Sequence, residues 1–262
     1  MTPGTQDIHH PETLLITGAT GGIGWALALA YAAPGRTLIL HGRNAARLDE
    51  LQQACQALGA RVVTTRFDLC DPQATIATLR ELSQHEQIDL AIVNAGVTRP
   101  LGDGDAVESW DAVREVLAVN LDGALATVAG VLPRMRQRGS GQGADQGDLA
   151  AWVGLPRTPT YSASKAALKV YGEALRAWLA PQGIAVNVVL PGYVHTAMTG
   201  RISSPKPSLM TPARAATLIR RGLERNHARI TFPAGLATGT RLLSMLPADM
   251  ARRVLGWMGY GT

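Results

Sequence analysis

Short apolar runs alternate with longer amphipathic stretches along this chain, and that alternation limits its fold more than any other feature. Apolar runs of about five residues predict strands, and the stretches of ten or more residues between them predict helices. Strands and helices in this order form βαβ units, which build a parallel sheet. The expected strands are residues 13–17, 37–41, 61–66, 88–93, 184–190 and 229–232. The expected helices are residues 22–33, 45–58, 72–83, 106–119, 123–138, 162–179, 212–226 and an amphipathic stretch at 242–258.

The alternation breaks at Gly139–Asp148, where a fifth strand is due but the sequence reads GSGQGADQGD. None of these residues favours a strand. A central strand of a parallel sheet is buried on both faces and normally consists of Val, Ile and Leu. Two glycines, two aspartates and a glutamine at 143–148 would cost several kcal/mol if they were buried without partners. The flanking residues on both sides are ordinary, so this patch of six residues is foreign to the rest of the chain.

The composition is that of one globular domain over residues 1–262. Hydrophobic residues make up 46% and charged residues 17%, which is enough apolar material for a large core and too little charge for disorder. Only two cysteines occur, Cys55 and Cys70, so we expect neither a disulfide scaffold nor a zinc site, and no other metal site. No apolar run reaches the roughly 18–20 residues of a membrane span, and residues 1–10 lack a signal-peptide pattern. The expected location is the cytoplasm.

The net charge of +5 is concentrated near the end of the chain. Residues 201–262 carry 10 basic and 2 acidic groups, whereas residues 1–200 carry 15 basic and 18 acidic groups. The favoured explanation is an arginine-rich composition on solvated helix faces. The alternatives are a surface for an acidic substrate, an anionic lipid or a partner. Nucleic acid is not expected, because no interleaved aromatic residues accompany the charge.

A glycine-rich turn, TGATGGIG, lies between the first strand and the first helix. Glycines permit the tight turn and let a pyrophosphate approach the backbone, where the N-terminus of the helix offers free N–H groups. The spacing fits both G-x-x-x-G-x-G and G-x-x-G-x-x-G, because Gly21 is also present, so the glycines alone do not separate two related families. The residues expected to hold the nucleotide here are Thr17, Gly18, Thr20, Gly22, Ile23 and Gly24.

The end of the second strand indicates which nucleotide is bound. A carboxylate at this place accepts a hydrogen bond from the ribose 2′-hydroxyl and repels a 2′-phosphate. The segment here is His41-Gly-Arg-Asn44 and has no carboxylate. Gly42 leaves room, and the Arg43 guanidinium can bind a phosphate, with Asn44 beside it. The sequence therefore favours NADP over NAD; the alternative is that Arg43 is only a solvated residue at a helix start.

Tyr161 and Lys165 are spaced four residues apart at the start of a predicted helix, in the motif YSASK. They therefore share one face of the helix, one turn apart. A cation near a phenol favours the phenolate and lowers the tyrosine pKa, which suits proton exchange with an alcohol or ketone.

Together with the glycine turn, Asn94-Ala-Gly96, Asn120 and Pro191-Gly192, this motif resembles the single-domain short-chain dehydrogenase/reductase family over about residues 12–200. The resemblance implies an α/β, Rossmann-like, doubly wound parallel sheet of about seven strands with helices on both faces. It implies Tyr161 as the catalytic acid/base, Lys165 as its partner and ribose ligand, and Asn120 as support for a proton-relay water. It also implies cofactor contacts from Asp68, Leu69, Asn94, Ala95, Gly96, Tyr161, Lys165, Pro191, Gly192, Val194 and Thr196.

The same resemblance implies hydride transfer between NADP and a small-molecule carbonyl or secondary alcohol, by a homodimer or homotetramer. It places a substrate lid near 197–212, followed by the basic tail. Met198, Leu209 and Met210 are candidates for an apolar pocket, but no residue names the substrate.

One position departs from the family pattern. The family's catalytic serine precedes the tyrosine by thirteen residues, and Asp148 stands there. An ionised carboxylate cannot donate a hydrogen bond to the substrate oxygen and repels an alkoxide, whereas a protonated one can donate only if its pKa is strongly raised. Three explanations stay open: a nucleotide-binding protein with little or no catalysis, a rearranged strand with another oxygen-binding group, or a local frame slip in the gene.

Overall fold

The computed structural model describes residues 10–101, 107–202 and 204–260, and its centre is a sheet of seven parallel strands. The strand order is β3-β2-β1-β4-β5-β6-β7, so the winding reverses between β1 and β4, as in a doubly wound Rossmann sheet. The expected fold class is confirmed. The strands are β1 (Thr13–Ile16), β2 (Thr37–His41), β3 (Arg61–Thr65), β4 (Leu90–Val93), β5 (Gly141–Gln146), β6 (Ile184–Pro191) and β7 (Arg229–Phe232).

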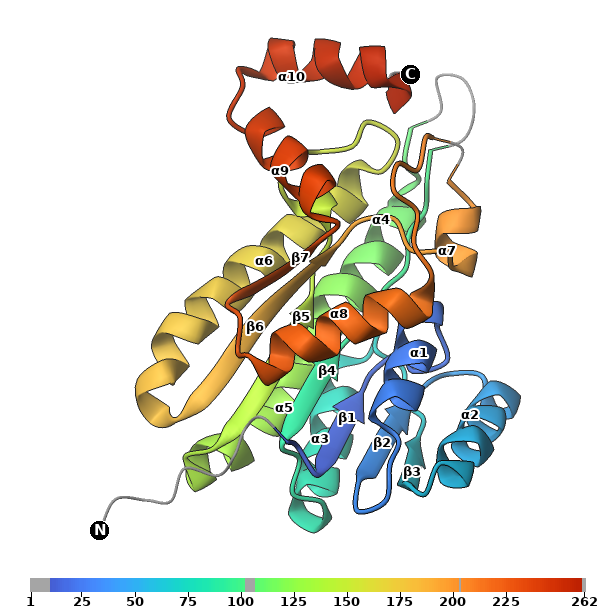
Figure 1. The fold of residues 1–262 in the computed structure, drawn as a ribbon, viewed down its shortest axis with the longest axis vertical. Helices are drawn as coiled ribbons and strands as arrows, with labels where there is room; N and C mark the ends of the chain where they lie inside the picture. The colour runs from blue at the N-terminus through green and yellow to red at the C-terminus, as the bar shows by residue number, and fades with distance from the viewer. Residues whose placement is uncertain (1–9, 102–106, 203, 261–262) are drawn as a thin grey trace.

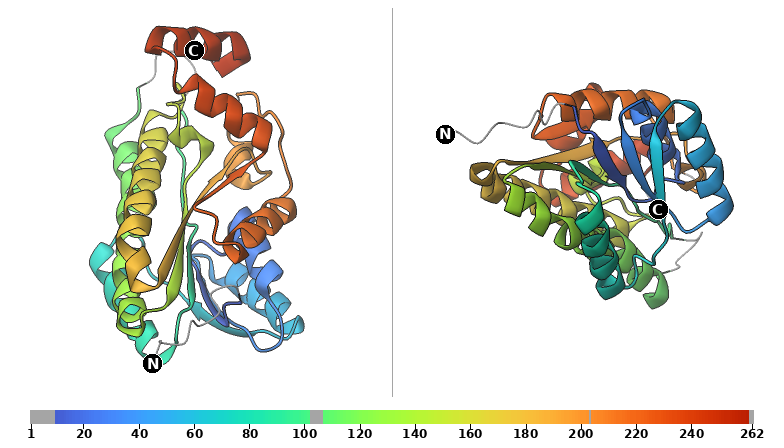
Figure 2. Two further views of the ribbon diagram at one scale, coloured as in Figure 1. Left: turned by 60° about the vertical axis from the view of Figure 1, so that its left-hand side comes forward. Right: turned by 90° about the horizontal axis from the view of Figure 1, so that it is seen from below.

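Helices cover both faces of the sheet (Figures 1 and 2). One layer contains α1 (Gly22–Tyr31), α2 (Ala45–Ala57) and α8 (Pro212–Glu224), whose apolar side chains pack on alternate strand residues such as Leu14 and Leu38. The other contains α3 (Pro72–His85), α5 (Gly123–Arg138) and α6 (Pro159–Leu179), which pack on the intervening residues such as Leu15 and Ile39. The two cores follow the period of two along each strand.

The polar patch at 139–148 forms strand β5 in its ordinary place, between β4 and β6. A rearranged strand is therefore ruled out. Gln142 is satisfied by neighbours: its Nε2 donates to Asn187 Oδ1 of β6 at 2.8 Å and to the carbonyl of Leu223 at 3.0 Å. Asp145, which is 2% exposed, keeps one carboxylate oxygen without a partner.

The C-terminal region differs from its prediction. The expected single helix at 242–258 is wrong: α9 (Ala234–Leu243) and α10 (Ala248–Leu255) are separate, and Pro247 precedes the second one. Proline fits at the start of a helix but not in its interior, which explains the break. Figure 1 shows both helices beyond the end of β7, at the upper end of the molecule in that view.

Smaller differences concern helix starts. The helix expected at 162–179 already begins at Pro159, and α4 (Trp110–Leu117) begins later than the expected residue 106, which lies outside the described residues, as does the segment 1–9. A short helix, α7 (Ala197–Gly200), lies at the start of the expected lid.

One helical run, Trp110–Arg138, is long and apolar enough to cross a membrane by length and composition alone. Half of its most apolar window is buried in the domain, as in a core helix of a soluble protein, so it is weak evidence for a span. Within the described ranges, no group of three or more His, Cys, Asp or Glu side chains is placed to hold a metal ion.

Candidate active site

A cavity of about 1140 Å³ opens at the carboxyl ends of the strands, where ligands bind in open α/β sheets. It brings together most of the residues expected to bind the cofactor, although they come from six separate segments. Those lining it are Gly18, Thr20, Gly22, Ile23, Gly24, Arg43, Asn44, Asp68, Leu69, Asn94, Ala95, Gly96, Tyr161, Lys165, Pro191, Gly192, Val194 and Thr196.

Thr17 is an expected cofactor residue that does not line the cavity. It is fully buried, and its Oγ1 accepts hydrogen bonds from the backbone N–H groups of Asn94 at 3.0 Å and Ala95 at 3.2 Å. Asn94 in turn donates through Nδ2 to the carbonyls of Thr17 and Gly18. These bonds hold the glycine turn against the turn that follows β4. Thr17 therefore supports the site without lining the cavity.

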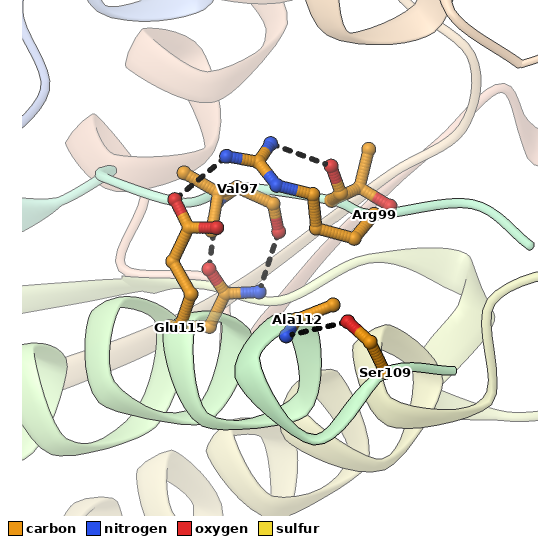
Figure 3. Close-up of polar contacts among 7 residues, drawn as sticks. Val97, Arg99, Ser109, Ala112 and Glu115 are labelled. Carbon is orange, nitrogen blue, oxygen red and sulfur yellow. Dashed lines mark hydrogen bonds and ion pairs between the residues drawn. The ribbon is translucent and has the colours of Figure 1, made fainter.

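Asn120 also lies behind the cavity wall. It sits on a π-helical turn, Ala118–Asp122, between α4 and α5. Its Oδ1 accepts from Val97 N at 2.7 Å, and its Nδ2 donates to the Val97 carbonyl at 3.0 Å and to Ser164 Oγ at 3.2 Å. The side chain therefore fixes the segment after β4 to α6. The neighbouring Arg99–Glu115 ion pair, 2.7 Å long, ties the same segment to α4 (Figure 3).

The glycine turn fits a nucleotide because side chains there would collide with the fold. A Cβ on Gly18, whose φ is +63°, would lie 2.8 Å from Ala95 Cα, and a Cβ on Gly24 would lie 2.4 Å from the Gly18 carbonyl oxygen. Gly21, which precedes α1, provides no side-chain cap for that helix. The first turn of α1 thus presents uncapped backbone to the cavity, as a pyrophosphate site requires. The residues present therefore fit a dinucleotide.

Two further residues of the site lie near the end of β2 and were not predicted from the sequence. His41, the last residue of β2, accepts from the Gly18 N–H through Nδ1 and donates from Nε2 to the Phe67 carbonyl at 3.0 Å. Burial lowers its pKa, which agrees with this neutral tautomer. Arg47, one turn into α2, lines the cavity with Arg43 and stacks over Trp25. Its position one helical turn beyond Asn44 was the available signal.

Tyr161 and Lys165 meet Asp148 on the cavity wall. The Tyr161 hydroxyl donates to Asp148 Oδ2 at 2.9 Å, and Asp148 Oδ1 accepts from the Ala150 N–H at 2.8 Å. Lys165 is 4% exposed, and its Nζ donates to the carbonyl of Gln146, the last residue of β5, at 2.8 Å. The Lys165 ammonium lies 5.6 Å from the centre of the Tyr161 ring.

Burial dominates the electrostatics of this group. It raises the pKa of Tyr161 well above its usual range, and the adjacent Asp148 carboxylate raises that pKa further. A lowered pKa of Tyr161 was expected, but the net shift is upward, because burial and a carboxylate in direct contact oppose the phenolate and outweigh the cation of Lys165. Burial also lowers the pKa of Lys165 to about 8, against the opposing pull of Asp148 and Asp145. The pKa of Asp148 is raised, mainly by burial.

Beyond this polar group, many of the residues that line the cavity are apolar. Met198 of α7 lines it as expected, but Leu209 and Met210 do not: Leu209 is 44% exposed, and Met210 bridges to Val194. The contribution of the C-terminal helices to the cavity was not predicted from the sequence, although the amphipathic pattern at 242–258 indicated it. The tail residues lining the cavity include Leu236, Leu243, Leu246, Val254, Leu255 and Tyr260.

Comparisons with known proteins agree with this arrangement. The sequence model described as short chain dehydrogenase matches residues 12–207. A Myxococcus xanthus protein named as an oxidoreductase is 36% identical over 238 residues, which are 90% of this chain and 93% of that one. A short-chain dehydrogenase from Sphingobium yanoikuyae in complex with NADPH superposes with a TM-score of 0.79 at 27% identity, over 94% of this chain and 95% of its own.

A second solved structure, a 3-oxoacyl-[acyl-carrier protein] reductase from Brucella melitensis with bound NAD, has a TM-score of 0.74 at 25% identity. It covers 87% of this chain and 92% of its own. Residues 12–207, which match the family's sequence model, contain the glycine turn, the turn after β4 and the Tyr161–Lys165 pair. This chain is an oxidoreductase that belongs to the short-chain dehydrogenase/reductase family.

Proposed function

We propose that this protein uses NADP to reduce an apolar carbonyl compound, or to oxidise the corresponding secondary alcohol. The observation that carries the proposal is that Tyr161 lines the same cavity as the glycine turn and the apolar residues of the tail. A proton donor at this place serves a carbonyl group whose carbon faces a nicotinamide.

NADP rather than NAD is supported by the end of β2. A Cβ on Gly42 would lie 2.8 Å from Thr20 Cγ2, so only glycine fits there, and no carboxylate stands at that point. Arg43 is exposed and lines the cavity, with Arg47 one turn away. Two guanidinium groups suit a 2′-phosphate. The Sphingobium structure holds NADPH and the Brucella one NAD, so family membership alone leaves the choice open.

In the mechanism, the protein positions the reactants and moves one proton. When bound, the nicotinamide would supply the hydride that reduces the carbonyl carbon. Tyr161 donates its proton to the carbonyl oxygen as negative charge develops there, and accepts it back in the reverse direction. Lys165 places a cation beside the resulting phenolate and lowers its energy. The apolar side chains of α9 and α10 exclude water and strengthen these interactions.

The proposal is tested by turnover of NADPH with a panel of apolar ketones and aldehydes. Tyr161→Phe keeps the ring and removes the proton. We expect it to abolish turnover while NADPH affinity, followed by the fluorescence of the reduced cofactor, stays within about twofold of wild type. Turnover by Tyr161→Phe at the wild-type rate would exclude Tyr161 as the acid.

A second candidate function, a nucleotide-binding protein with little or no catalysis, is favoured by the contact between Tyr161 and Asp148. It predicts NADPH binding, no turnover with any carbonyl compound in the panel, and no kinetic effect of Tyr161→Phe. The same assay therefore separates the two functions.

We also propose that the protein forms a homodimer or homotetramer and that it is located in the cytoplasm. The outer face of α6 supports association, since Val170 and Trp178 are 61% and 52% exposed. Sedimentation of wild type against Val170→Glu tests it, with dissociation as the expected result.

A further inference from the structure

The two oxygens of the Asp148 carboxyl group have different hydrogen-bond partners. This difference determines which oxygen carries the proton when the group is protonated. Oδ1 accepts the Ala150 N–H, whereas Oδ2 meets the Tyr161 hydroxyl at 2.9 Å. A proton on this carboxyl group therefore belongs on Oδ2, the oxygen on the Tyr161 side. Both residues line the cavity, so the two hydroxyl groups of the protonated pair lie side by side on its wall.

The ionised form of Asp148 works against the proposed chemistry. A carboxylate accepts the Tyr161 proton as a charge-assisted hydrogen bond and directs it away from a substrate. Negative charge developing on a carbonyl oxygen at the same place would be repelled by the carboxylate, and the low dielectric of the site strengthens that repulsion.

The protonated form supports the chemistry. Oδ2–H and the Tyr161 O–H would then both donate to one carbonyl oxygen, and two donors aimed at developing negative charge stabilise it. Tyr161 transfers its proton to the oxygen, which becomes the alcohol, and Asp148 keeps its own proton throughout. No further reactant is needed.

We propose that protonated Asp148 donates the second hydrogen bond to the substrate oxygen, and that its ionisation withdraws Tyr161 from the reaction. This inference rests on the proposed function. It makes the enzyme a proton-gated carbonyl reductase whose activity falls as the pH rises through the pKa of Asp148.

The groups around Asp148 determine the pH at which its carboxyl group ionises. Burial disfavours the carboxylate most strongly and raises the pKa, whereas the hydrogen bond from the Ala150 N–H and the charge of Lys165 on α6 favour the carboxylate. The hydroxyl of Tyr161 on α6 also favours the carboxylate. Asp145 on β5 competes for the charge of Lys165. Tyr193, after β6, is also close enough for its charge to interact with that of Asp148. One ammonium thus faces two carboxyl groups, so it cannot neutralise both.

The first test is the pH profile of kcat/KM for carbonyl reduction between about pH 5 and pH 9, a range that includes raised carboxyl values. Wild type should lose about tenfold per pH unit above the pKa of Asp148. Asp148→Ser and Asp148→Asn keep a donor that does not titrate, so both should lack this falling limb; any change that remains in them near pH 8 belongs to Lys165, whose pKa is about 8. Asp148→Ser should exceed wild type by about 100-fold at the alkaline end, the typical value of one such donor.

Matched variants identify the group responsible. Asp145→Asn removes the other buried carboxyl group and should retain the falling limb. If wild type and Asp148→Ser have the same profile, or if Asp145→Asn abolishes the limb, the gate is not Asp148. Asp148→Ser/Tyr161→Phe tests the proposed function separately: activity equal to that of Asp148→Ser would refute Tyr161 as the acid, whatever Asp148 does.

The second test needs neither cofactor nor turnover. Ultraviolet difference spectra of the cofactor-free protein follow tyrosine ionisation, and Tyr161→Phe identifies the contribution of Tyr161. Asp148→Ser should lower the pH at which Tyr161 ionises, because a neighbouring negative charge is removed. An unchanged Tyr161 titration would overturn the proposal even if no substrate were found.

Discussion

The Gln142 side chain of β5 reaches diagonally to Asn187 of β6, and the two amides form a 2.8 Å hydrogen bond inside the sheet layer beneath α8. Asn187 is fully buried, and its Nδ2 donates onward to Asn226 Oδ1 at 3.1 Å and to the His227 carbonyl at 2.7 Å. Because each buried amide has partners, the polar start of β5 is tolerated among apolar strands.

Asn187→Leu should therefore destabilise the fold by about 1–3 kcal/mol, since it leaves the buried Gln142 amide short of an acceptor. Gln142→Leu/Asn187→Leu should cost less than the sum of the two single changes, because the shared bond is lost only once. Urea unfolding measures all three. Strictly additive values would show that the two amides do not interact.

Asp145 should make stability depend on pH. Burial raises its pKa to about 7 in the folded protein, against about 3.9 when it is unfolded. The folded state therefore binds this proton more tightly, and the resulting stabilisation is complete below about pH 4 and lost as the pH rises to about 7. The loss is at most about 4 kcal/mol, because one pKa unit corresponds to about 1.4 kcal/mol.

Asp145→Asn should flatten this part of the pH–stability curve, as measured by urea unfolding at about pH 5 and about pH 8. Asp49→Asn, at an exposed position on α2, is the control and should leave the wild-type slope. A slope that survives in Asp145→Asn would assign the effect to another buried group.

Most of the fold and most of the residues expected to bind the cofactor could be predicted from the sequence, because local patterns determine them. The strands of five or so apolar residues, the glycine turn and the Tyr161–Lys165 spacing each report on structure within a few residues. What could not be predicted depends on contacts across the fold. Gln142 finds a partner in β6, 45 positions further along the chain, so its polarity alone gave the wrong impression of β5. The pKa of Tyr161 depends on burial by several elements and on the carboxylate 13 positions earlier, not on Lys165 alone.

Arg43→Ala should weaken NADPH binding by about tenfold and leave NADH binding unchanged, because only NADPH carries the 2′-phosphate that a guanidinium can bind. The measurement is a fluorescence titration with each reduced cofactor. Arg80→Ala, an exposed change on α3 in the opposite helix layer, is the control for net charge. Equal losses for the two cofactors would place Arg43 outside the 2′-phosphate site.

The apolar wall should govern substrate affinity without affecting the nucleotide. Leu243, near the end of α9, lines the cavity, whereas Met245 two residues later is 76% exposed and does not. Leu243→Asn removes apolar surface from the substrate end of the cavity and should raise KM for a bulky apolar ketone by about tenfold, equivalent to about 1.4 kcal/mol of lost burial. Met245→Asn should leave KM unchanged, and neither variant should change NADPH affinity, because neither residue belongs to the segments expected to hold the nucleotide. If Leu243→Asn raised KM equally for a small polar ketone, the effect would be a disturbed α9 rather than a lost apolar contact.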